Sequence, residues 1–324
     1  MTERLDAFMA RANAAYYATR DPYADFTTAP EISQAFGEVL GLWAAVVWRM
    51  MGAPTPVILA EAGPGRGTLM TDALRAIGRI APAFGAALRL HLVETSPRLR
   101  ALQAGCLAGA VWHDRIEQLP AGPLLLLANE FLDALPARQF VRRGAGWTER
   151  YVAAGRFVEI SAAAPELEAA EGEVVEVGEA ARAVAATLGE RLAATGGAAL
   201  FVDYGPERSA PGDSLQALRG RAPADPLLAE GEADLTTHVD FSAIAAAARA
   251  AGAGAQGPVP QGIFLARLGL PQRTDALARG KPPARAAALM NAARRLTEPY
   301  AMGRLFKALA ICHPALPALP GFAA

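Results

Sequence analysis

The stretch Glu61-Ala-Gly-Pro-Gly-Arg-Gly-Thr-Leu-Met70 decides the fold. It follows the apolar run PVILA, and apolar residues recur after its glycines at helical spacing: Leu69, Met70, Ala73, Leu74, Ile77 and Ile80. The pattern predicts a strand, a glycine-rich turn and a helix that packs on a sheet. Gly63, Gly65 and Gly67 can adopt positive φ and leave no side chain between the backbone and a nucleotide-like ligand.

The spacing of these glycines narrows the class of ligand. Thr68 stands where a GxGxxG dinucleotide fingerprint has its third glycine, and the GK[ST] ending of a P-loop is absent. An acidic residue two positions before a GxGxG loop is typical of class I S-adenosylmethionine (SAM) methyltransferases, in which the carboxylate faces the ligand's ammonium group. Glu61 is that residue, and Glu94 ends the next predicted strand, where it can accept hydrogen bonds from both ribose hydroxyls. The alternative is a tight turn beside a solvated acid.

Composition limits the remaining classes of function. The 324 residues, 52% of them hydrophobic, are enough for a sizeable core in one large domain with insertions. Because 31 Lys and Arg balance 32 Asp and Glu, nucleic acid is not an expected partner, although a local basic patch remains open. Two cysteines and four singly scattered histidines predict neither a disulfide framework nor a metal site: Cys106, Cys312, His91, His113, His238 and His313.

No segment of the sequence predicts targeting or membrane insertion. The first residues, MTERLDAFMARANAAYY, are charged early and lack the apolar core of a signal peptide. The apolar stretch LGLWAAVVW ends at Arg49 and is shorter than the roughly 18 residues that a spanning helix needs. These features predict a soluble protein in the cytoplasm, and they leave its oligomeric state open.

Residues 1–52 are predicted to form an N-terminal helical cap. Apolar residues from Ile32 to Met50 repeat at i, i+3 and i+4, which indicates a long amphipathic helix. Thr28 and Glu31 can form a capping box at its start, with Pro30 in the first turn. The alternative is that this polar turn closes over the cofactor, and periodicity does not distinguish the two.

Residues 53–313 alternate between strand and helix patterns, which indicates a parallel, doubly wound α/β sheet. Two insertions interrupt it, at about 138–178 and 206–239. The first alternates like a small antiparallel sheet, and the second reads as a long loop up to Glu232. Asp240 is a natural N-cap for the helix that follows, with Val239 and Ile244 as a hydrophobic staple. Residues 314–324 are a tail.

The motif NEFLDALP, Asn129 to Pro136, is predicted to carry the chemistry at the end of the fourth strand. Glu130 and Asp133 are three residues apart, so on a helical first turn they share a face and could hold a planar guanidinium by forked hydrogen bonds. Methyl transfer is an in-line displacement that mainly requires alignment and removal of water. Alternatively, the two acids complement the helix dipole. Asp203–Gly205 are weaker candidates for residues that border the acceptor site. His238 is a weaker candidate for a general base.

Eight strings resemble the MidA-like methyltransferases in the same order, from Tyr16 to Ile311: YYATRDPYADFTTAPEISQAFGE, EAGPGRGTLMTDALR, HLVETSPRLRALQ, NEFLDALPARQF, GDSLQALRG, GEADLTTHVDFSA, QGIFLARLG and MGRLFKALAI. The resemblance implies a seven-stranded, Rossmann-like class I methyltransferase fold that uses SAM. For mitochondrial members it implies symmetric dimethylation of an arginine in a complex I subunit. By motif, the expected SAM ligands are Glu61, Gly63, Gly65, Gly67 and Glu94, and Asn129 with Glu130 would line the cofactor and acceptor cleft.

The sequence departs from this family at one place. Asp21-Pro22-Tyr23-Ala24 runs straight into Asp25, where the family usually has a glycine-containing stretch.

The leading expectation is a protein arginine methyltransferase acting on a respiratory complex. The alternatives are an assembly factor that keeps the fold but acts by docking a partner, and a small-molecule methyltransferase, because loops determine the acceptor.

Overall fold

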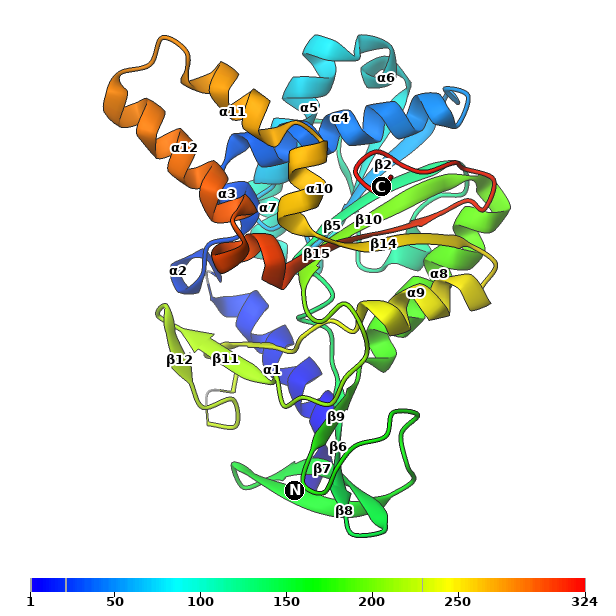
Figure 1. The fold of residues 1–324 in the computed structure, drawn as a ribbon, viewed down its shortest axis with the longest axis vertical. Helices are drawn as coiled ribbons and strands as arrows, with labels where there is room; N and C mark the ends of the chain where they lie inside the picture. The colour runs from blue at the N-terminus through cyan, green and yellow to red at the C-terminus, as the bar shows by residue number, and fades with distance from the viewer. Residues whose placement is uncertain (1, 21, 229, 324) are drawn as a thin grey trace. The chain divides into compact units, whose positions relative to one another are not determined.

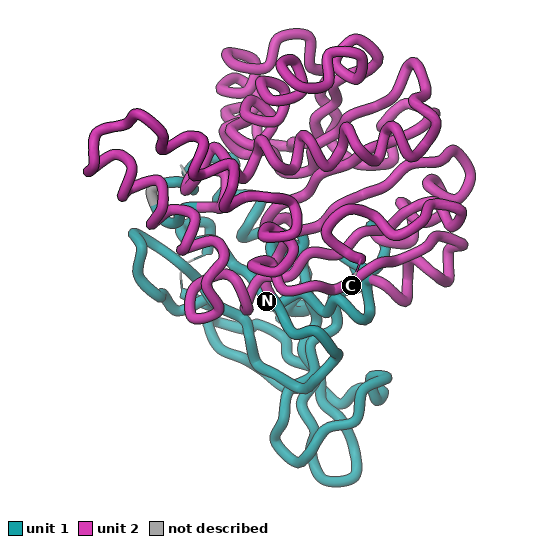
Figure 2. The backbone as a smooth tube through the Cα atoms, turned by 45° about the horizontal axis from the view of Figure 1, so that its top comes forward, with its two compact units in different colours: residues 1–27, 132–184, 205–244 teal, residues 28–131, 185–204, 245–324 magenta. Residues whose placement is uncertain are grey.

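The computed structural model describes residues 2–20, 22–228 and 230–323. Contacts divide the chain into two compact units, shown in different colours in Figure 2. Unit 1 contains residues 1–27, 132–184 and 205–244, and unit 2 contains residues 28–131, 185–204 and 245–324. These boundaries differ from the expected ranges, because the first fifty residues are shared between the units and both insertions belong to unit 1.

Unit 2 is built on a seven-stranded sheet in the order β14-β15-β10-β5-β2-β3-β4 (Figure 1). Its strands are β2 (Val57–Ala62), β3 (Leu88–Val93), β4 (Val111–His113), β5 (Leu124–Asn129), β10 (Gly197–Tyr204), β14 (Gly254–Pro260) and β15 (Phe306–Cys312). The five strands from β10 to β4 are parallel, whereas β15 runs antiparallel to β10 and β14. The predicted seven-stranded α/β sheet is therefore confirmed, with an antiparallel edge that the expectation of a parallel sheet missed.

The helices of unit 2 connect these strands, except for the first two, which precede β2. They are α3 (Ala29–Ile32), α4 (Gln34–Met50), α5 (Thr68–Ile80), α6 (Pro82–Ala87), α7 (Pro97–Ala104), η1 (Ile116–Gln118), α10 (Gln261–Arg267), α11 (Leu270–Ala278), α12 (Pro283–Thr297) and η2 (Pro299–Gly303). Two further helices begin in unit 1 and end in unit 2, namely α8 (Glu179–Thr195) and α9 (Phe241–Ala250).

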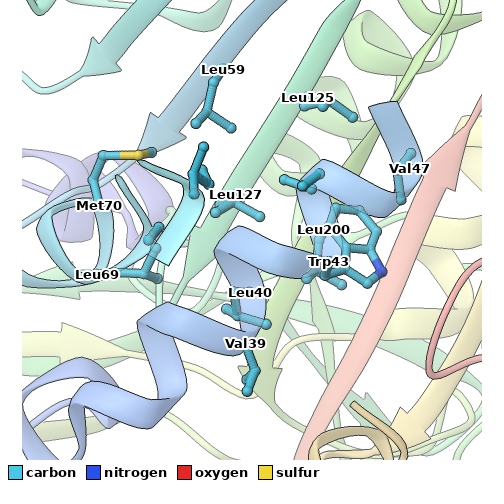
Figure 3. Packing of buried hydrophobic residues seen from close by; sticks show 14 of the residues in the cluster. Val39, Leu40, Trp43, Val47, Leu59, Leu69, Met70, Leu125, Leu127 and Leu200 are labelled. Atoms are coloured by element: carbon cyan, nitrogen blue, oxygen red, sulfur yellow. The ribbon is translucent and has the colours of Figure 1, made fainter. Parts of the chain in front are cut away.

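The core of unit 2 forms where α4 and α5 pack on the sheet. Figure 3 shows side chains of both helices meeting those of β2, β5 and β10, including Trp43, Leu69, Leu59, Leu127 and Leu200. Two glycines of α4 let the helices approach closely. A Cβ atom at Gly37 would lie 2.7 Å from the carbonyl oxygen of Leu69, and one at Gly41 would lie 2.7 Å from the Cα of Ala73. Side chains at these positions would push the helices apart.

The long amphipathic helix is confirmed, but its predicted start is wrong. The TAPE turn forms the separate four-residue helix α3, and Thr28 makes no capping hydrogen bond with its side chain. Helix α4 begins after Ser33, whose hydroxyl accepts a hydrogen bond from the Ala35 N–H. The capping box fails because the Glu31 carboxylate is used elsewhere, as the acceptor of a hydrogen bond from the Thr68 hydroxyl.

In its described residues, unit 1 contains two antiparallel sheets and two complete helices, besides the starts of α8 and α9. The larger sheet has the order β1-β7-β6-β9, with β8 on the free side of β7, and the smaller has the order β12-β11-β13. The elements are β1 (Thr2–Arg4), α1 (Leu5–Thr19), α2 (Pro22–Asp25), β6 (Arg138–Arg143), β7 (Gly146–Ala153), β8 (Arg156–Ala162), β9 (Val174–Val177), β11 (Gln216–Arg219), β12 (Ala222–Ala224) and β13 (Asp234–Thr236). Helix α1 packs Leu5, Phe8 and Met9 into a cluster that includes Val152 and Leu235.

Predictions for the insertions and for two neighbouring or earlier segments had mixed outcomes. The antiparallel sheet in the first insertion is confirmed, whereas the long loop predicted up to Glu232 contains the β11–β12 hairpin. The Asp240 N-cap is confirmed, since its carboxylate accepts a hydrogen bond from the Ala243 N–H at 2.9 Å. The short Asp21–Asp25 stretch forms α2 from Pro22 onward, and Asp21 lies outside the described residues.

The expected tail at residues 314–324 is partly packed against unit 2. Leu319 is fully buried in the core, and the ring of Phe322 lies 5.1 Å from that of Phe264. Because these side chains bury apolar surface, the segment adds to the core. Across the described part of the chain, no helix combines the length and the apolar character needed to cross a membrane.

Candidate functional site

The glycine-rich turn between β2 and α5 adopts a conformation that only glycine takes readily. Gly63, Gly65 and Gly67 have φ values of 65°, 55° and 81°, all in the left-handed region. Gly67 caps α5, and a Cβ atom there would lie 3.0 Å from the Leu107 side chain. The predicted strand, turn and helix are therefore present, with bare backbone at the carboxyl end of a central strand.

Glu61 lies at the end of β2 with an incompletely paired carboxylate. Its side chain is buried and accepts a hydrogen bond from the backbone N–H of Met70, in the first turn of α5. Its second oxygen, Oε2, is buried and has no hydrogen-bond partner within the described residues. Burial, together with the charge of the nearby Glu94 carboxylate, raises the pKa of Glu61 to about 8, against the hydrogen bond from the Met70 N–H, which lowers it. A cation placed here would stabilise the ionised form.

Glu94 directly follows β3, and a buried glutamine joins it to the glycine turn. The Glu94 carboxylate accepts hydrogen bonds from the Ser96 N–H at 2.8 Å and from Gln103 Nε2 at 3.3 Å. Gln103 Nε2 also donates to the Gly65 carbonyl at 2.7 Å, and Gln103 Oε1 accepts from Trp112 Nε1 at 2.8 Å. Burial raises the pKa of Glu94 against these hydrogen bonds. Gln103 therefore fixes the turn relative to the acid.

Asn129 and Glu130 end the neighbouring strand β5. Asn129 Nδ2 donates to Glu130 Oε1 at 2.9 Å, while Asn129 Oδ1 is buried without a hydrogen-bond partner in the described chain. Glu130 Oε1 also accepts from the Ala29 N–H at 3.1 Å. The TAPE turn is thus bonded to the end of β5 through Ala29 and to the start of α5 through Glu31.

The predicted helical turn that would align Glu130 with Asp133 is wrong. Glu130 has a φ of 49°, in the left-handed region, and no helix follows it. The two acids also fall in different compact units, so each is described within its own. In unit 1, Asp133 is buried, and the charge of its carboxylate adds to burial in raising the pKa of Asp234 to about 7.

The weaker candidates have local roles in the structure. The Asp203 carboxylate, at the end of β10, accepts hydrogen bonds from the Phe131 N–H at 3.1 Å and from the Tyr204 N–H at 2.9 Å. These bonds support the turn that follows β5. His238 is exposed in unit 1, and its backbone N–H donates to the Ser214 hydroxyl at 2.7 Å.

Unit 2 therefore gathers carboxylates at the carboxyl ends of four neighbouring strands: Glu61, Glu94, Glu130 and Asp203. In open α/β sheets this edge is where ligands bind. A ligand with positive charge and hydroxyl groups fits such a set of acceptors, and SAM carries a sulfonium, an ammonium and a ribose. Among the described residues, no group of three or more His, Cys, Asp or Glu could hold a metal ion.

Sequence reasoning missed two contacts that shape this edge. Gln103 has no motif of its own, and only its place in the string HLVETSPRLRALQ, one helix after Glu94, gave a signal. His91 and His113 were treated as scattered, yet adjacent strands place their Nδ1 and Nε2 atoms 2.9 Å apart. The first contact depends on the packing of α7 beside the glycine turn and the second on strand pairing, and the order of residues alone specifies neither.

The sheet and the glycine turn of unit 2 are those of a class I SAM-dependent methyltransferase. The family described as "Putative S-adenosyl-L-methionine-dependent methyltransferase" matches residues 39–259. The chain belongs to this MidA-like family. The family expected from the sequence motifs is thereby confirmed, as is SAM as the cofactor.

Curated relatives extend the similarity to most of the chain. One is the mitochondrial protein arginine methyltransferase NDUFAF7 homolog of Drosophila melanogaster, 33% identical over 96% of this chain and 80% of the relative. Another is mitochondrial NDUFAF7 of Danio rerio, 33% identical over 90% of this chain and 77% of the relative. A crystal structure from Burkholderia thailandensis, bound to S-adenosyl-homocysteine, is similar with a TM-score of 0.82 at 29% identity, covering 99% of this chain and 90% of that one.

The expected cytoplasmic location is contradicted by these relatives. The proteins from Drosophila melanogaster, Danio rerio and Homo sapiens are all named as mitochondrial. The expectation rested on the absence of a recognisable signal in the first residues, and this absence does not identify a compartment.

Proposed function

We propose that this chain is a protein arginine N-methyltransferase whose substrate is a subunit of respiratory complex I. The names of the relatives support transfer to a protein arginine, and the resemblance of the motifs to the MidA-like family supports the complex I substrate. The structural observation that supports the methyltransferase part of the proposal is the turn of three left-handed glycines flanked by the buried carboxylates Glu61 and Glu94.

We assign cofactor binding to the residues at the carboxyl edge of the sheet: Glu61, Gly63, Gly65, Gly67, Glu94 and Asn129. Glu61 Oε2 and Asn129 Oδ1 are buried acceptors without protein partners in the described chain, and a cationic ligand with N–H donors would satisfy both. Glu94 is held by Ser96 and Gln103 in an orientation that leaves acceptor capacity for a hydroxyl pair. The fit rests on these acceptors and on the bare backbone of the turn.

We assign the acceptor side of the site in unit 2 to Glu130. Bound SAM supplies a methyl group on a sulfonium, and transfer to a guanidinium nitrogen releases one proton from that nitrogen. Glu130 would hold the guanidinium by charge-assisted hydrogen bonds and take up the proton. Its half-buried carboxylate is already fixed by Asn129 and Ala29, so it loses little freedom when the substrate binds.

The first test is cofactor binding. S-adenosylhomocysteine titrated calorimetrically into the wild-type chain should release measurable heat. In Gly65→Val that heat should disappear, because a β-branched residue at a φ of 55° is strained and fills the turn. Equal heats for both proteins would rule out the assignment of the turn.

The second test separates binding from transfer. With labelled SAM and extract from a strain lacking the protein, the wild-type chain should label a protein on arginine. Glu130→Gln keeps an oxygen for the Ala29 and Asn129 hydrogen bonds but removes the charge, so it should bind cofactor normally and stop labelling. The exposed Glu117→Gln is a matched control that should label normally. Normal turnover in Glu130→Gln would exclude the acceptor role, and cofactor binding without any labelled product would favour a docking factor.

A further inference from the structure

One segment of unit 2 has a charge that the balanced composition hides. Residues 261–305 contain eight Lys and Arg against two acids, a formal charge of +6, whereas the whole chain has a formal charge of −1. The segment forms α10, α11, α12 and η2, which follow one another from yellow-orange to dark orange in Figure 1. The positive charge is therefore gathered in one helical subregion of unit 2.

Most of this charge is free to meet a partner. We define the basic surface as the six exposed residues Arg279, Lys281, Arg285, Arg294, Arg295 and Arg304. Within the described chain, none of the six forms an ion pair or donates a side-chain hydrogen bond. The segment's other two basic residues differ, since Arg273 is paired with the buried Glu38 and Arg267 donates to the Gly321 carbonyl.

Helix α12 presents a wide solvent-facing surface in this segment. It buries only Ala293 and Leu296, and its large apolar residues Leu289 and Met290 are half-buried. Besides Pro283 at its start, its exposed residues are Ala284, Arg285, Ala287, Ala288, Asn291, Arg294 and Arg295. At 100° per residue these seven share one side of the helix, which is therefore composed of small and cationic side chains without an acid.

The shape of this face distinguishes among anionic partners. A helix that enters a lipid interface exposes bulky apolar side chains, but this face exposes alanines between its arginines. Single-stranded nucleic acid binds to rows of aromatic residues, and the segment exposes one aromatic side chain, Tyr300, which is 85% exposed. Small residues instead let another helix approach closely, while arginine and tyrosine are the residues enriched at protein interfaces.

We propose that the basic surface on α11, α12 and η2 docks an acidic helical segment of a protein partner. The choice of a protein among polyanions rests on the proposed function, in which the substrate is a protein. Carboxylates of the docked helix pair with Arg285, Arg294 and Arg295. The exposed alanines of α12 set the distance between the two helices.

The experiment uses the full chain without SAM. A fluorescent peptide of about 20 residues, built from Glu and Ala so that it is helical, is titrated with the protein and followed by anisotropy. The same peptide with Lys in place of Glu, vesicles of phosphatidylcholine with phosphatidylserine, and single-stranded DNA are tested alongside it. The variant R285Q/R294Q/R295Q removes three charges from the face of α12, and R79Q/R89Q/R249Q removes three from exposed arginines elsewhere in unit 2.

The acidic peptide should bind the wild-type chain and the control triple equally and should lose at least about tenfold in affinity with R285Q/R294Q/R295Q. Its affinity should also fall as salt rises, since exposed charges are screened. Equal binding to both triples, binding of the lysine peptide, or preferential binding of vesicles or DNA would each overturn the proposal. Because no cofactor is present, failure here is distinguishable from failure of methyl transfer, which is measured separately with labelled SAM.

Discussion

The buried carboxyl of Glu61 gives a prediction that links proton and cofactor binding. Its pKa is raised to about 8, so at pH 7 only about one molecule in ten carries the ionised carboxylate. If the cationic cofactor binds the ionised form, the proton must leave first. The affinity for S-adenosylhomocysteine should therefore rise by about tenfold between pH 6 and pH 7 and level off near pH 8.

The assay is calorimetric titration of S-adenosylhomocysteine at several pH values on the wild-type chain and on Glu61→Gln. Measurements below about pH 7.5 avoid the range in which α-amino groups lose their own proton. The variant cannot ionise at this position, so it should bind more weakly than the wild type at about pH 7.5 and keep only the shallower dependence that Glu94 contributes through its raised pKa. An unchanged slope in Glu61→Gln would refute the reasoning.

The same group predicts the pH dependence of stability without cofactor. A folded-state pKa of about 8 against an ordinary value of 4.5 means that the folded chain holds a proton that the unfolded chain has lost. The proton on Glu61 therefore contributes roughly 5 kcal/mol to the free energy of unfolding. This contribution is fully present below about pH 4.5 and is lost as the pH rises to about 8. The melting temperature should accordingly fall across this range in the wild type and fall less in Glu61→Gln.

Three further substitutions test the structure around the site. Gln103→Leu removes the partners of the Gly65 carbonyl and the Trp112 indole, so S-adenosylhomocysteine affinity should fall and thermal stability should drop by about 1–3 kcal/mol; unchanged affinity would contradict its positioning role. Gly41→Ala places a methyl group against Ala73 and should cost about 1–3 kcal/mol in urea unfolding while the folded fraction still binds cofactor. Asp240→Ala should lose about 1 kcal/mol in the same assay through the missing N-cap of α9, and no loss would mean that the cap is not needed.

Much of the sheet was predictable because its strands are buried and continuous in the sequence. β2 and β5 are fully buried runs of mostly apolar residues, with the polar residues Glu61 and Asn129 at their carboxyl ends. The antiparallel edge was not predictable, because β15 has the same apolar pattern whichever way it runs beside β10. The start of α4 was also missed. Thr28 and Glu31 match the pattern of a capping box, but the Glu31 carboxylate instead accepts a hydrogen bond from the hydroxyl of Thr68, 37 residues away.

The candidate site divides in the same way. Local sequence was sufficient for the glycine turn and for Glu61 and Glu94, because left-handed backbone requires glycine and the ends of parallel strands meet at one edge. It failed for Glu130 and Asp133, where three-residue spacing suggested a helix that the left-handed φ of Glu130 prevents.

The amino-acid order by itself determined the strand, glycine turn and helix from Val57 to Ile80, since each depends on neighbours within a few residues. Tertiary structure alone decided which side chains complete the edge of the sheet. Gln103 reaches Gly65, and Ala29 reaches Glu130, only because the fold brings together segments that are 38 and 101 residues apart. Hydrogen bonds and burial act on distance in space, so the pKa of Glu61 and the orphaned oxygens of the site are properties of the folded chain.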